Sequence, residues 1–267
     1  MSLPEPREDG TALITGASSG IGAEFARELA SRGIGVTLVA RREDRLRDLA
    51  AELTESHGVR AEVISLDLGA EDGRRSLPGR LERKALEVDV LVNNAGFGYT
   101  GDFAEADPAR QVEMVELNCA VVVDLSGRLL PGMLARGSGA IVNVASTAAF
   151  QPMPKSATYA ATKAFVLSFS EALHSELERT GVNVTAVCPG PVKTEFTDVA
   201  GIRGEEQLPG VFWTPAEQIA RDAVEAAAAG KRTIVPGRLN HAGSILGRHT
   251  PRGLSLPITK RVWGRTE

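Results

Sequence analysis

A tyrosine and a lysine, Tyr159 and Lys163, lie four residues apart in a stretch, Thr158–Glu178, whose pattern predicts a helix. Side chains at this spacing project from one face of a helix. A free tyrosine has a pKa of about 10, and a neighbouring ammonium favours the phenolate, which lowers that pKa. Tyr159 could therefore give up and take back a proton near neutral pH, as a general acid for carbonyl reduction or a general base for alcohol oxidation.

Ser146 follows a strand expected at Ala140–Ala145, so its hydroxyl would lie at a strand end. There it could hydrogen-bond a substrate oxygen and stabilise the charge that develops on it. Taken one at a time, these residues also suit ordinary roles. Tyr159 could be an amphipathic helix residue, Lys163 a surface charge and Ser146 a turn residue. The catalytic interpretation depends on their occurring together with a cofactor site.

A glycine-rich segment, Thr15-Gly16-Ala17-Ser18-Ser19-Gly20-Ile21-Gly22, joins a strand expected at Thr11–Thr15 to a helix expected at Gly20–Arg32. Glycines let the backbone turn tightly and approach a pyrophosphate, and the free N–H groups of the opening helix favour that anion. No lysine follows the last glycine, so the segment is not a nucleoside-triphosphate loop. A plain glycine-rich turn is the alternative, which the strand-loop-helix context disfavours.

The second expected strand, Gly35–Ala40, ends in Arg41 and Arg42 rather than in an acid. A carboxylate at this point would bind the ribose 2′-hydroxyl of NAD, whereas guanidinium groups suit the 2′-phosphate of NADP(H). We therefore predict NADP(H) as the cofactor. The alternative is that both arginines are solvated charges ahead of a helix cap at Glu43 or Asp44.

Apolar strands alternate with helical patterns along the chain and predict an α/β fold. Because the strands are apolar on nearly every position, both faces of the sheet should be covered. The fold class is a single Rossmann-type doubly wound parallel sheet of about seven strands, flanked by helices on both faces. The expected strands are Thr11–Thr15, Gly35–Ala40, Ala61–Leu66, Asp89–Val92, Ala140–Ala145, Val182–Cys188 and Lys231–Val235.

Two helix starts carry local signals. Asp107-Pro108 supplies an N-cap and a first-turn proline, and Thr214-Pro215-Ala216-Glu217 predicts a capping box in which Glu217 reaches back to the Thr214 amide. No linker divides residues 10–235, so residues 1–240 are predicted to form one catalytic domain and residues 241–267 a basic C-terminal extension that packs on it or on a partner.

Composition excludes several classes. A net charge of −4 argues against a protein that coats nucleic acid. Cys119 and Cys188 show no metal-ligand spacing and are expected to be buried free thiols. The N-terminus lacks the pattern of a signal peptide, and no apolar run approaches the roughly 20 residues of a membrane span. These features predict a soluble, cytoplasmic protein.

These motifs together resemble those of the short-chain dehydrogenases/reductases, over about residues 11–236 and in the family's order. The matching motifs are Thr15-Gly16-x3-Gly20-Ile21-Gly22, Asn93-Asn94-Ala95-Gly96, the set Asn118, Ser146, Tyr159 and Lys163, and Pro189-Gly190-Pro191-Val192-Lys193-Thr194. The resemblance implies a catalytic set of Asn118, Ser146, Tyr159 and Lys163, in which Lys163 also binds the nicotinamide ribose and Asn118 anchors a proton-carrying water. It further implies that Asp67 holds the adenine and that Thr194 contacts the nicotinamide amide.

The cofactor contacts that follow from the motifs and the resemblance extend along much of the chain. They comprise Gly16, Ser18, Ser19, Gly20, Ile21, Gly22, Arg41, Arg42, Asp67, Leu68, Asn94, Ala95, Gly96, Tyr159, Lys163, Pro189, Gly190, Val192 and Thr194. Asn94 is expected mainly to brace the sheet. Tyr99 either lines the substrate cleft or is only a loop aromatic. The resemblance also implies a homodimer or homotetramer formed through the two long central helices.

The substrate, a small carbonyl or alcohol compound, is not specified by these motifs. In the resembling family it is shaped by the loop after the sixth strand, here Glu195–Trp213, and by the C-terminal segment. Apolar residues in that loop suggest a hydrophobic compound, or else they cover the domain's own core. They are Phe196, Val199, Ile202, Leu208, Val211, Phe212 and Trp213.

Two other activities stay open: a sugar-nucleotide epimerase-like enzyme, and a protein that senses NADP(H) without turnover. The epimerase-like enzymes have a larger C-terminal domain than the roughly 75 residues after Cys188, and sensing proteins generally lose the Tyr or the Lys.

The tail adds a further question, because residues 231–267 carry eight Lys or Arg and one acid. It could pack on the acidic body or a partner subunit and close the cleft, rest on an anionic membrane, or be disordered; packing is favoured.

Overall fold

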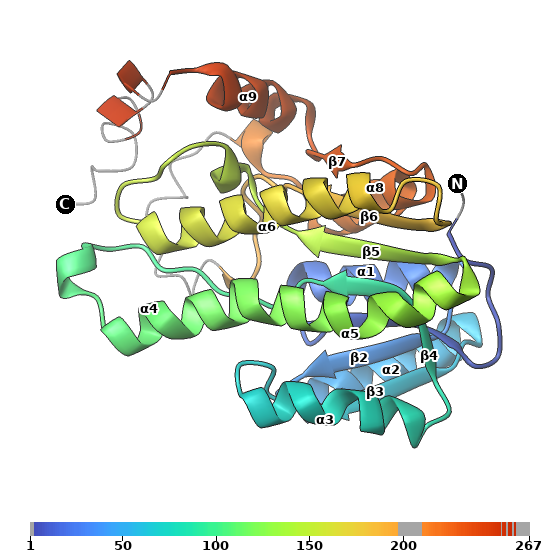
Figure 1. The fold of residues 1–267 in the computed structure, drawn as a ribbon. Helices are drawn as coiled ribbons and strands as arrows, with labels where there is room; N and C mark the ends of the chain where they lie inside the picture. The colour runs from blue at the N-terminus through green and yellow to red at the C-terminus, as the bar shows by residue number, and fades with distance from the viewer. Residues whose placement is uncertain (1–2, 197–209, 252, 255, 258, 260–267) are drawn as a thin grey trace.

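A computed structural model describes residues 3–196, 210–251, 253–254, 256–257 and 259 (Figure 1). Three of the apolar loop residues considered above, Val199, Ile202 and Leu208, lie outside the described residues. Four of the eight basic residues of the tail, Arg252, Lys260, Arg261 and Arg265, also lie outside them.

The strands form one parallel sheet in the order β3-β2-β1-β4-β5-β6-β7. The doubly wound fold predicted from the apolar strand pattern is confirmed. Their bounds are β1 Gly10–Thr15, β2 Val36–Ala40, β3 Ala61–Ser65, β4 Glu87–Asn93, β5 Gly139–Val144, β6 Val182–Val187 and β7 Thr233–Ile234.

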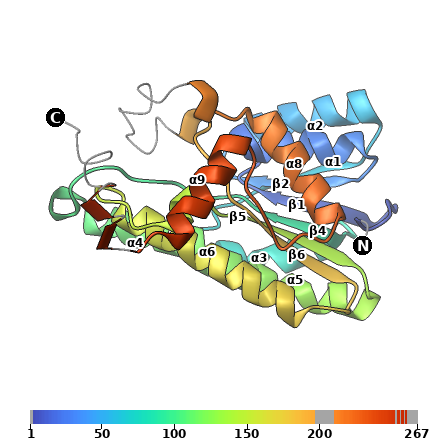
Figure 2. The same ribbon diagram turned by 90° about the horizontal axis from the view of Figure 1, so that it is seen from above.

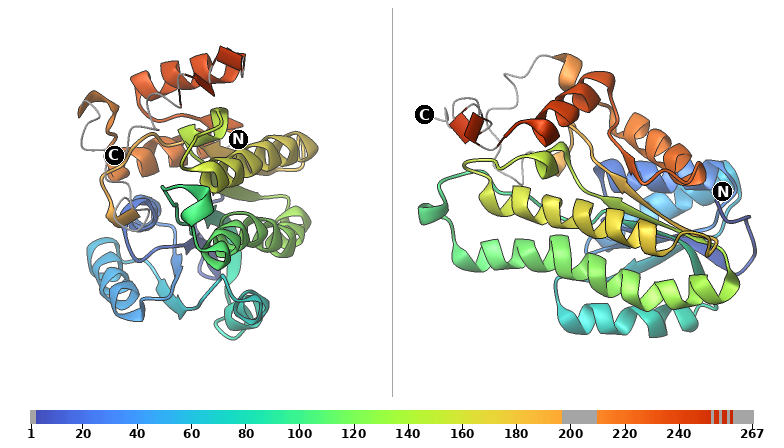
Figure 3. Two further views of the ribbon diagram at one scale, coloured as in Figure 1. Left: turned by 90° about the vertical axis from the view of Figure 1, so that its left-hand side faces the viewer. Right: turned by 45° about the horizontal axis from the view of Figure 1, so that its top comes forward.

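Helices cover both faces of this sheet (Figures 1 and 2). One face carries α1 Gly20–Ser31, α2 Glu43–His57 and α8 Ala216–Ala228. The other carries α3 Glu71–Glu82, α5 Val121–Arg136 and α6 Ala157–Glu176, with α4 Pro108–Val115 leading into α5 through a π-helical turn, Glu116–Ala120. Helix α9 Arg238–His249 lies beyond β7 and above α6 (Figure 3).

Successive strand residues point to opposite faces, so each strand contributes to two hydrophobic cores. Ile14 and Leu38 pack with Phe25 of α1 on one face, whereas Leu13 and Leu91 pack on the other. This two-sided burial explains why the strands lack the polar alternation of a half-exposed sheet. The predicted burial of Cys119 and Cys188 as free thiols is confirmed.

The chain reverses its direction of winding between β1 and β4. β1 pairs with β2 on one side and with β4 on the other, and the chain reaches β4 only after passing through β3 and α3. At such a point the loops that leave two neighbouring strands turn in opposite directions and open a crevice at the carboxyl ends of the strands. The sheet therefore determines where a ligand site can form.

The local signals had different outcomes. The Asp107 cap is confirmed, because its carboxylate accepts the Ala109 N–H at 3.0 Å. The capping box at Thr214 is wrong. The Thr214 N–H donates to Pro191 O at 3.2 Å and its hydroxyl accepts from Asn240 at 3.3 Å, so α8 begins after Pro215 with no side-chain cap. Tertiary partners have taken the groups that a local motif would have used.

Element ends also differ from the sequence prediction by a few residues. β7 is only Thr233–Ile234 rather than Lys231–Val235, because only Thr233 and Ile234 pair with β6. α6 ends at Glu176, two residues earlier than expected.

One helical run among the described residues, Pro108–Arg136, is long and apolar enough to cross a membrane by length and composition alone. It consists of α4, the π-helical turn and α5, and residues such as Leu125 and Met133 are buried against the sheet. The core helix of a protein in water passes the same test. The sequence pattern did not reveal this run, because charged residues such as Asp124 and Arg128 interrupt it.

Candidate active site

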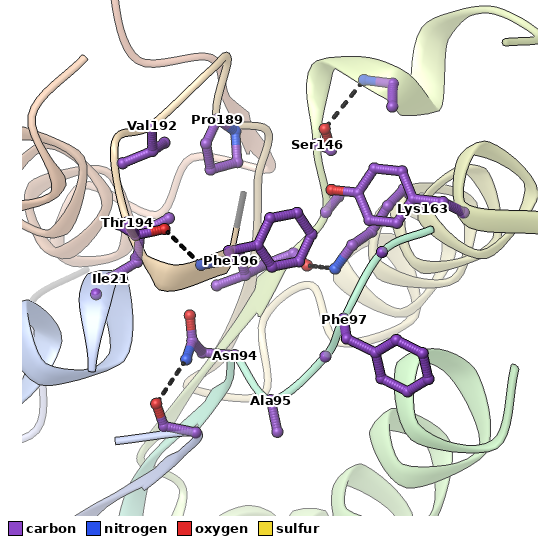
Figure 4. Close-up of a pocket in the computed structure, with 18 of the residues that line it drawn as sticks. Ile21, Asn94, Ala95, Phe97, Ser146, Lys163, Pro189, Val192, Thr194 and Phe196 are labelled. Atoms are coloured by element: carbon purple, nitrogen blue, oxygen red, sulfur yellow. Dashed lines mark hydrogen bonds between the residues drawn. The ribbon is translucent and has the colours of Figure 1, made fainter. Parts of the chain in front are cut away.

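A cleft of about 1130 Å³ opens at the carboxyl ends of the central strands. It brings together residues from the whole length of the described chain, from Gly16 near the N-terminus to Gly247 in α9. Of the predicted site residues, all but Gly22 and Asn118 line it. Figure 4 shows Ile21 and Thr194 on one side of this cleft and Ser146 and Lys163 on the other.

The glycines of the first loop are required by backbone shape and by close contact. Gly16 and Gly20 adopt φ values of +67° and +55°, which side chains with a Cβ disfavour. A Cβ on Gly22 would lie 2.3 Å from Gly16 O and 2.5 Å from Asn94 Nδ2. Gly22 therefore acts from behind the cleft by letting α1 pack closely on the loop, while the N–H groups at the start of α1 remain available for an anion.

Asn94 fastens this loop to β4. Its amide donates to Thr15 O at 2.9 Å and to Gly16 O at 3.3 Å, and Thr15 Oγ1 accepts the N–H groups of Asn94 and Ala95. The bracing role expected for Asn94 thus has a specific form, a set of bonds between two strand ends. Ala95 (Figure 4) and Gly96 follow Asn94 in the chain and also line the cleft.

The guanidinium of Arg42 points back over the glycine loop. It donates to Ser18 Oγ at 2.9 Å and to Ser19 Oγ at 2.8 Å, and Arg41 lines the same part of the cleft. Neither Glu43 nor Asp44 caps α2, whose N-cap position is Arg42 itself. Arg41, Arg42, Ser18 and Ser19 form a polar region of the cleft, the arginine corner, that is rich in hydrogen-bond donors.

Two charged residues that the sequence analysis did not identify complete this corner. The carboxylate of Glu195 accepts from Arg42 Nη1 at 2.8 Å and from Arg45 Nη1 at 2.6 Å. These two guanidinium groups lower the pKa of Glu195 to about 2. Arg45 follows Arg42 by one helical turn, which could have been noticed, but nothing local to Glu195 indicates a partner some 150 residues away.

The end of β3 adds the next wall. Asp67 and Leu68 both line the cleft, and the Asp67 carboxylate accepts the Gly69 N–H at 2.9 Å. Asp67 is exposed, whereas Leu68 is buried at 4% exposure. This pairing suits the adenine ring of a nucleotide, which could pack on the apolar surface of Leu68 and hydrogen-bond to the carboxylate of Asp67.

Tyr159, Lys163 and Ser146 meet on the opposite side of the cleft. Lys163 Nζ donates to Val144 O at 2.8 Å and lies 5.9 Å from the centre of the Tyr159 ring. The side chain is 6% exposed, and this burial lowers the pKa of Lys163 to about 8. Ser146 Oγ accepts the Ala148 N–H at 3.1 Å, which orients the hydroxyl at the start of a short 3₁₀ turn (Figure 4).

Asn118 lies behind this group instead of in the cleft. Its amide nitrogen donates to Phe97 O and Thr162 Oγ1, both at 3.0 Å, and its oxygen accepts the Phe97 N–H at 3.1 Å. The π-helical turn in which Asn118 lies brings it to 1% exposure. In this structure its side chain positions the Gly96–Phe97 backbone, so a role as an anchor for water stays a prediction.

The segment after β6 returns the chain to the cofactor loop. Pro189, Gly190, Val192 and Thr194 all line the cleft, and the side chain of Thr194 packs against Gly20. Phe196 follows, with its ring 5.7 Å from that of Tyr159 at an interplanar angle of 51°. Figure 4 shows Phe196 between Thr194 and Lys163, so it crosses the cleft from one side towards the other.

The C-terminal helix α9 adds a wall to the cleft, and it lies in the part of the chain that the sequence analysis expected to pack on the body and close the cleft. The side chain of Asn240 is buried against Gly190 and donates to Phe212 O at 3.1 Å. Arg248 reaches Glu171 of α6 at 3.4 Å. α9 begins at Arg238, so it spans the boundary that we expected between residues 240 and 241. Its cleft-lining residues are Leu239, Asn240, Gly243, Ser244 and Gly247.

Taken together, a glycine loop at the switch point of a doubly wound parallel sheet and a Ser-Tyr-Lys group beside it define a Rossmann-type nucleotide-binding class. Comparison with known proteins specifies the family. A family model described as short chain dehydrogenase matches residues 10–202. The chain therefore belongs to the short-chain dehydrogenase/reductase family, a family of oxidoreductases.

Individual relatives agree with this assignment. The chain is 34% identical over 265 residues to a very-long-chain 3-oxoacyl-CoA reductase of Anas platyrhynchos, covering 95% of this chain and 81% of the relative. It is 41% identical over 187 residues to a sulfoacetaldehyde reductase of Chromohalobacter salexigens, covering 69% and 73%. A short-chain dehydrogenase from Sphingobium yanoikuyae, solved in complex with NADPH, superposes with a TM-score of 0.79 at 33% identity, covering 91% and 97%.

Proposed function

We propose that this protein is an NADP(H)-dependent oxidoreductase that interconverts a carbonyl and a secondary alcohol, with Tyr159 as the general acid and base. One observation carries the proposal: Ser146, Tyr159 and Lys163 line the same cleft as the glycine loop and the arginine corner. The groups that would transfer the proton and the groups that would bind the nucleotide therefore line one cleft. The similarity to a dehydrogenase solved with NADPH supports the choice of cofactor.

The residues of the cleft fit NADP(H). Gly16 and Gly20 leave the loop without side chains at the point where a pyrophosphate would approach the start of α1, and Gly22 lets that helix pack closely behind the loop. Arg41, Arg42 and Ser18 offer donors suited to a 2′-phosphate. The volume of about 1130 Å³ exceeds the roughly 300–1,000 Å³ of common ligand pockets, which leaves room for a dinucleotide beside a substrate.

The chemistry divides between cofactor and protein. NADPH supplies the hydride that reduces the carbonyl carbon. Ser146 Oγ donates a hydrogen bond to the carbonyl oxygen and stabilises its developing negative charge. Tyr159 gives its phenolic proton to that oxygen, and in the reverse direction takes it back from the alcohol.

Lys163 has the task of supporting Tyr159. Its ammonium is held against Val144 O near the tyrosine ring, so its positive charge favours the phenolate that forms when the proton leaves. By family resemblance it also binds the nicotinamide ribose. Because burial lowers the pKa of Lys163 to about 8, the side chain is mostly protonated only below that pH.

The substrate part of the cleft favours a hydrophobic carbonyl compound. Its walls are largely apolar and include Tyr99, so we assign that residue to the substrate cleft rather than to an ordinary loop. The other apolar wall residues are Phe97, Leu117, Ala148, Phe150, Met153, Phe196, Phe212 and Leu239. Burial of apolar substrate surface against such walls contributes affinity roughly in proportion to the area covered.

A homo-oligomer formed through the long helices is part of the proposal. α4 and α5 expose Val112, Val115 and Val123, and α6 exposes Phe165 stacked on Phe169. Exposed apolar side chains gathered on two neighbouring helices are typical of a surface that is covered by another subunit. A cytoplasmic location and a single catalytic domain remain proposals from the sequence.

The test is a panel of ketones, aldehydes and secondary alcohols, followed through the absorbance of NADPH. We expect turnover with at least one apolar ketone, and NADPH binding at least about ten-fold tighter than NADH binding, because a lost charge-assisted contact costs about 1.5–3 kcal/mol. Intact NADPH binding with no turnover across the panel would instead favour a sensing protein. Purification with NAD locked in the cleft would favour the epimerase-like alternative.

A further inference from the structure

The arginine corner of the cleft already holds an anion that belongs to the chain itself. The two carboxylate oxygens of Glu195 accept from different arginines: Oε2 from Arg42, at the N-cap of α2, at 2.8 Å, and Oε1 from Arg45 of α2 at 2.6 Å. Arg42 also donates hydrogen bonds from Nε and Nη2 to Ser18 Oγ, and from Nη2 to Ser19 Oγ. A carboxylate bridging two guanidinium groups is the arrangement that a phosphate would also adopt there.

This ion pair lies in solvent rather than in the core. The side chains of Arg42, Arg45 and Glu195 are 42%, 44% and 47% exposed. Exposed ion pairs of this kind are individually weak and can be exchanged for a better partner. The two arginines hold the pKa of Glu195 at about 2, so its carboxylate remains ionised throughout the neutral range and repels any second anion in the corner.

The position of Glu195 in the chain connects the corner to the catalytic side. The next residue, Phe196, packs its ring on that of Tyr159 at 5.7 Å, and its N–H donates to Thr194 Oγ1 at 3.3 Å. Consecutive residues thus contact α2 on one face of the sheet and α6 on the other. Figure 4 shows Phe196 in the middle of the cleft.

We propose that Glu195 is a specificity-determining residue, an internal carboxylate that occupies the 2′-phosphate subsite and must give up Arg42 and Arg45 when NADP(H) binds. This inference rests on the proposed function, because it presupposes that the arginine corner takes a 2′-phosphate. Glu195 reduces affinity for ligands that carry a 2′-phosphate and leaves affinity for NADH nearly unchanged. The ratio of NADPH affinity to NADH affinity is therefore smaller in the wild-type protein than it would be if Arg42 and Arg45 had no carboxylate partner.

The exchange also loosens one of the contacts that hold Phe196 across the cleft. When a 2′-phosphate binds Arg42 and Arg45, the ion pairs of Glu195 with these arginines are lost. The segment from Thr194 to Phe196 is then no longer connected to α2 by these ion pairs. Binding at the adenosine end of the cleft is in this way coupled to the packing against Tyr159 at the other end. NADH, which has a hydroxyl in place of the phosphate, does not displace the carboxylate.

The experiment compares Glu195→Gln with the wild-type protein and with Glu43→Gln as the matched control. Glu43 follows Arg42 in the chain, pairs with Arg47, and is 49% exposed, so its substitution removes one negative charge from the start of α2 without touching the ion pairs of Glu195 with Arg42 and Arg45. Dissociation constants are measured by titration for NADPH, NADH and adenosine 2′,5′-bisphosphate. Melting temperatures confirm that each variant is folded, and Glu195→Ala is read in the same way as Glu195→Gln.

Glu195→Gln should bind NADPH and adenosine 2′,5′-bisphosphate at least about three-fold more tightly, as expected for removal of a competing carboxylate that forms two exposed ion pairs, while NADH affinity changes by less than about two-fold. Glu43→Gln should leave all three constants within that two-fold range. Unchanged or weaker NADPH binding in Glu195→Gln, or an equal gain for NADH or in Glu43→Gln, would overturn the inference. A failure of the proposed cofactor choice would be recognised separately, as a wild-type protein that binds NADH as tightly as NADPH.

Discussion

The nucleotide half of the cleft and its substrate half are built in different ways. The nucleotide half consists mainly of short contiguous segments at the ends of β1, β2, β3 and β4, where glycines and backbone groups shape much of the site. The substrate half is assembled from side chains of α9, the 3₁₀ turn after β5 and the segment after β6, which meet only in the folded chain. We infer that backbone geometry shapes the pyrophosphate part of the nucleotide half, whereas packing between distant segments determines which substrate is accepted.

Removing the phenolic oxygen of Tyr159 should have the largest effect, because it tests the group that serves both halves. Tyr159→Phe keeps the ring against Phe196 and removes only the proton donor, so turnover should fall by at least about 10². Affinity for NADPH should remain nearly unchanged. Steady-state kinetics on a confirmed substrate, with NADPH binding as the control, would check this, and near-normal kcat would mean that another group transfers the proton.

A pair of glycine substitutions compares the two halves directly. A Cβ on Gly22 would lie 2.3 Å from Gly16 O, so Gly22→Ala should displace the loop and weaken NADPH binding by at least about ten-fold, which corresponds to 1.4 kcal/mol. A Cβ on Gly243 of α9 would meet nothing within 4 Å. Gly243→Ala should leave NADPH affinity unchanged and stabilise the helix by up to about 1 kcal/mol.

Cofactor titration and thermal melting of both glycine variants give the result. Since Gly243 lines the cleft, its new methyl group should also alter the relative rates with ketones of different size. Equal losses of NADPH affinity in the two variants would remove the distinction between a backbone-built half and a packed half.

The buried charge of Lys163 should make the free energy of unfolding of the cofactor-free protein depend on pH. Burial lowers the pKa of Lys163 to about 8, whereas an unfolded lysine titrates near 10.4. Below pH 8 both states carry the proton, so the cost of burying the ammonium is present in full. Between pH 8 and about 10.4 the unfolded state binds more protons, so the wild-type stability rises with pH relative to a variant without the amine.

Lys163→Met should therefore be more stable than the wild-type protein at pH 7 by about 1–2 kcal/mol, less than the full burial cost because the bond to Val144 O is lost. The gain should shrink towards pH 10. Urea unfolding of both proteins at the two pH values measures this difference. A difference that stays the same at both pH values would show that the buried amine does not titrate as described.

Deleting residues 241–267 should have the smallest effect on the chemistry and act on the substrate half alone. The deletion removes Gly243, Ser244 and Gly247 from the cleft wall and Arg248 from its contact with Glu171. KM should rise, or the substrate range should broaden, with cofactor affinity nearly unchanged. Unchanged kinetics accompanied by lost binding to anionic liposomes would instead assign the tail to a membrane surface.

The two halves also differ in how far the sequence predicts them. Gly16 and Arg42 lie within two residues of a strand end and Gly20 opens the next helix, so their roles could be predicted from order and spacing. The sheet followed from the apolar strand pattern. Asn240 and Glu195 could not be predicted in this way, because their partners lie far away along the chain: Phe212 for Asn240, Arg42 and Arg45 for Glu195. The Thr214 capping box failed for the same reason, since Pro191 and Asn240 compete for its polar groups.

Transfer of deuterium tests the proposed reaction most directly. The wild-type protein is supplied with NADPH that carries deuterium at the transferable position of the nicotinamide ring, together with a ketone from the panel, and the alcohol is examined by mass spectrometry. We expect one deuterium on the carbinol carbon of the product, formed at a rate at least about 10² lower in Tyr159→Phe. Alcohol without deuterium, or cofactor that keeps its deuterium while substrate is consumed, would contradict carbonyl–alcohol interconversion at this site.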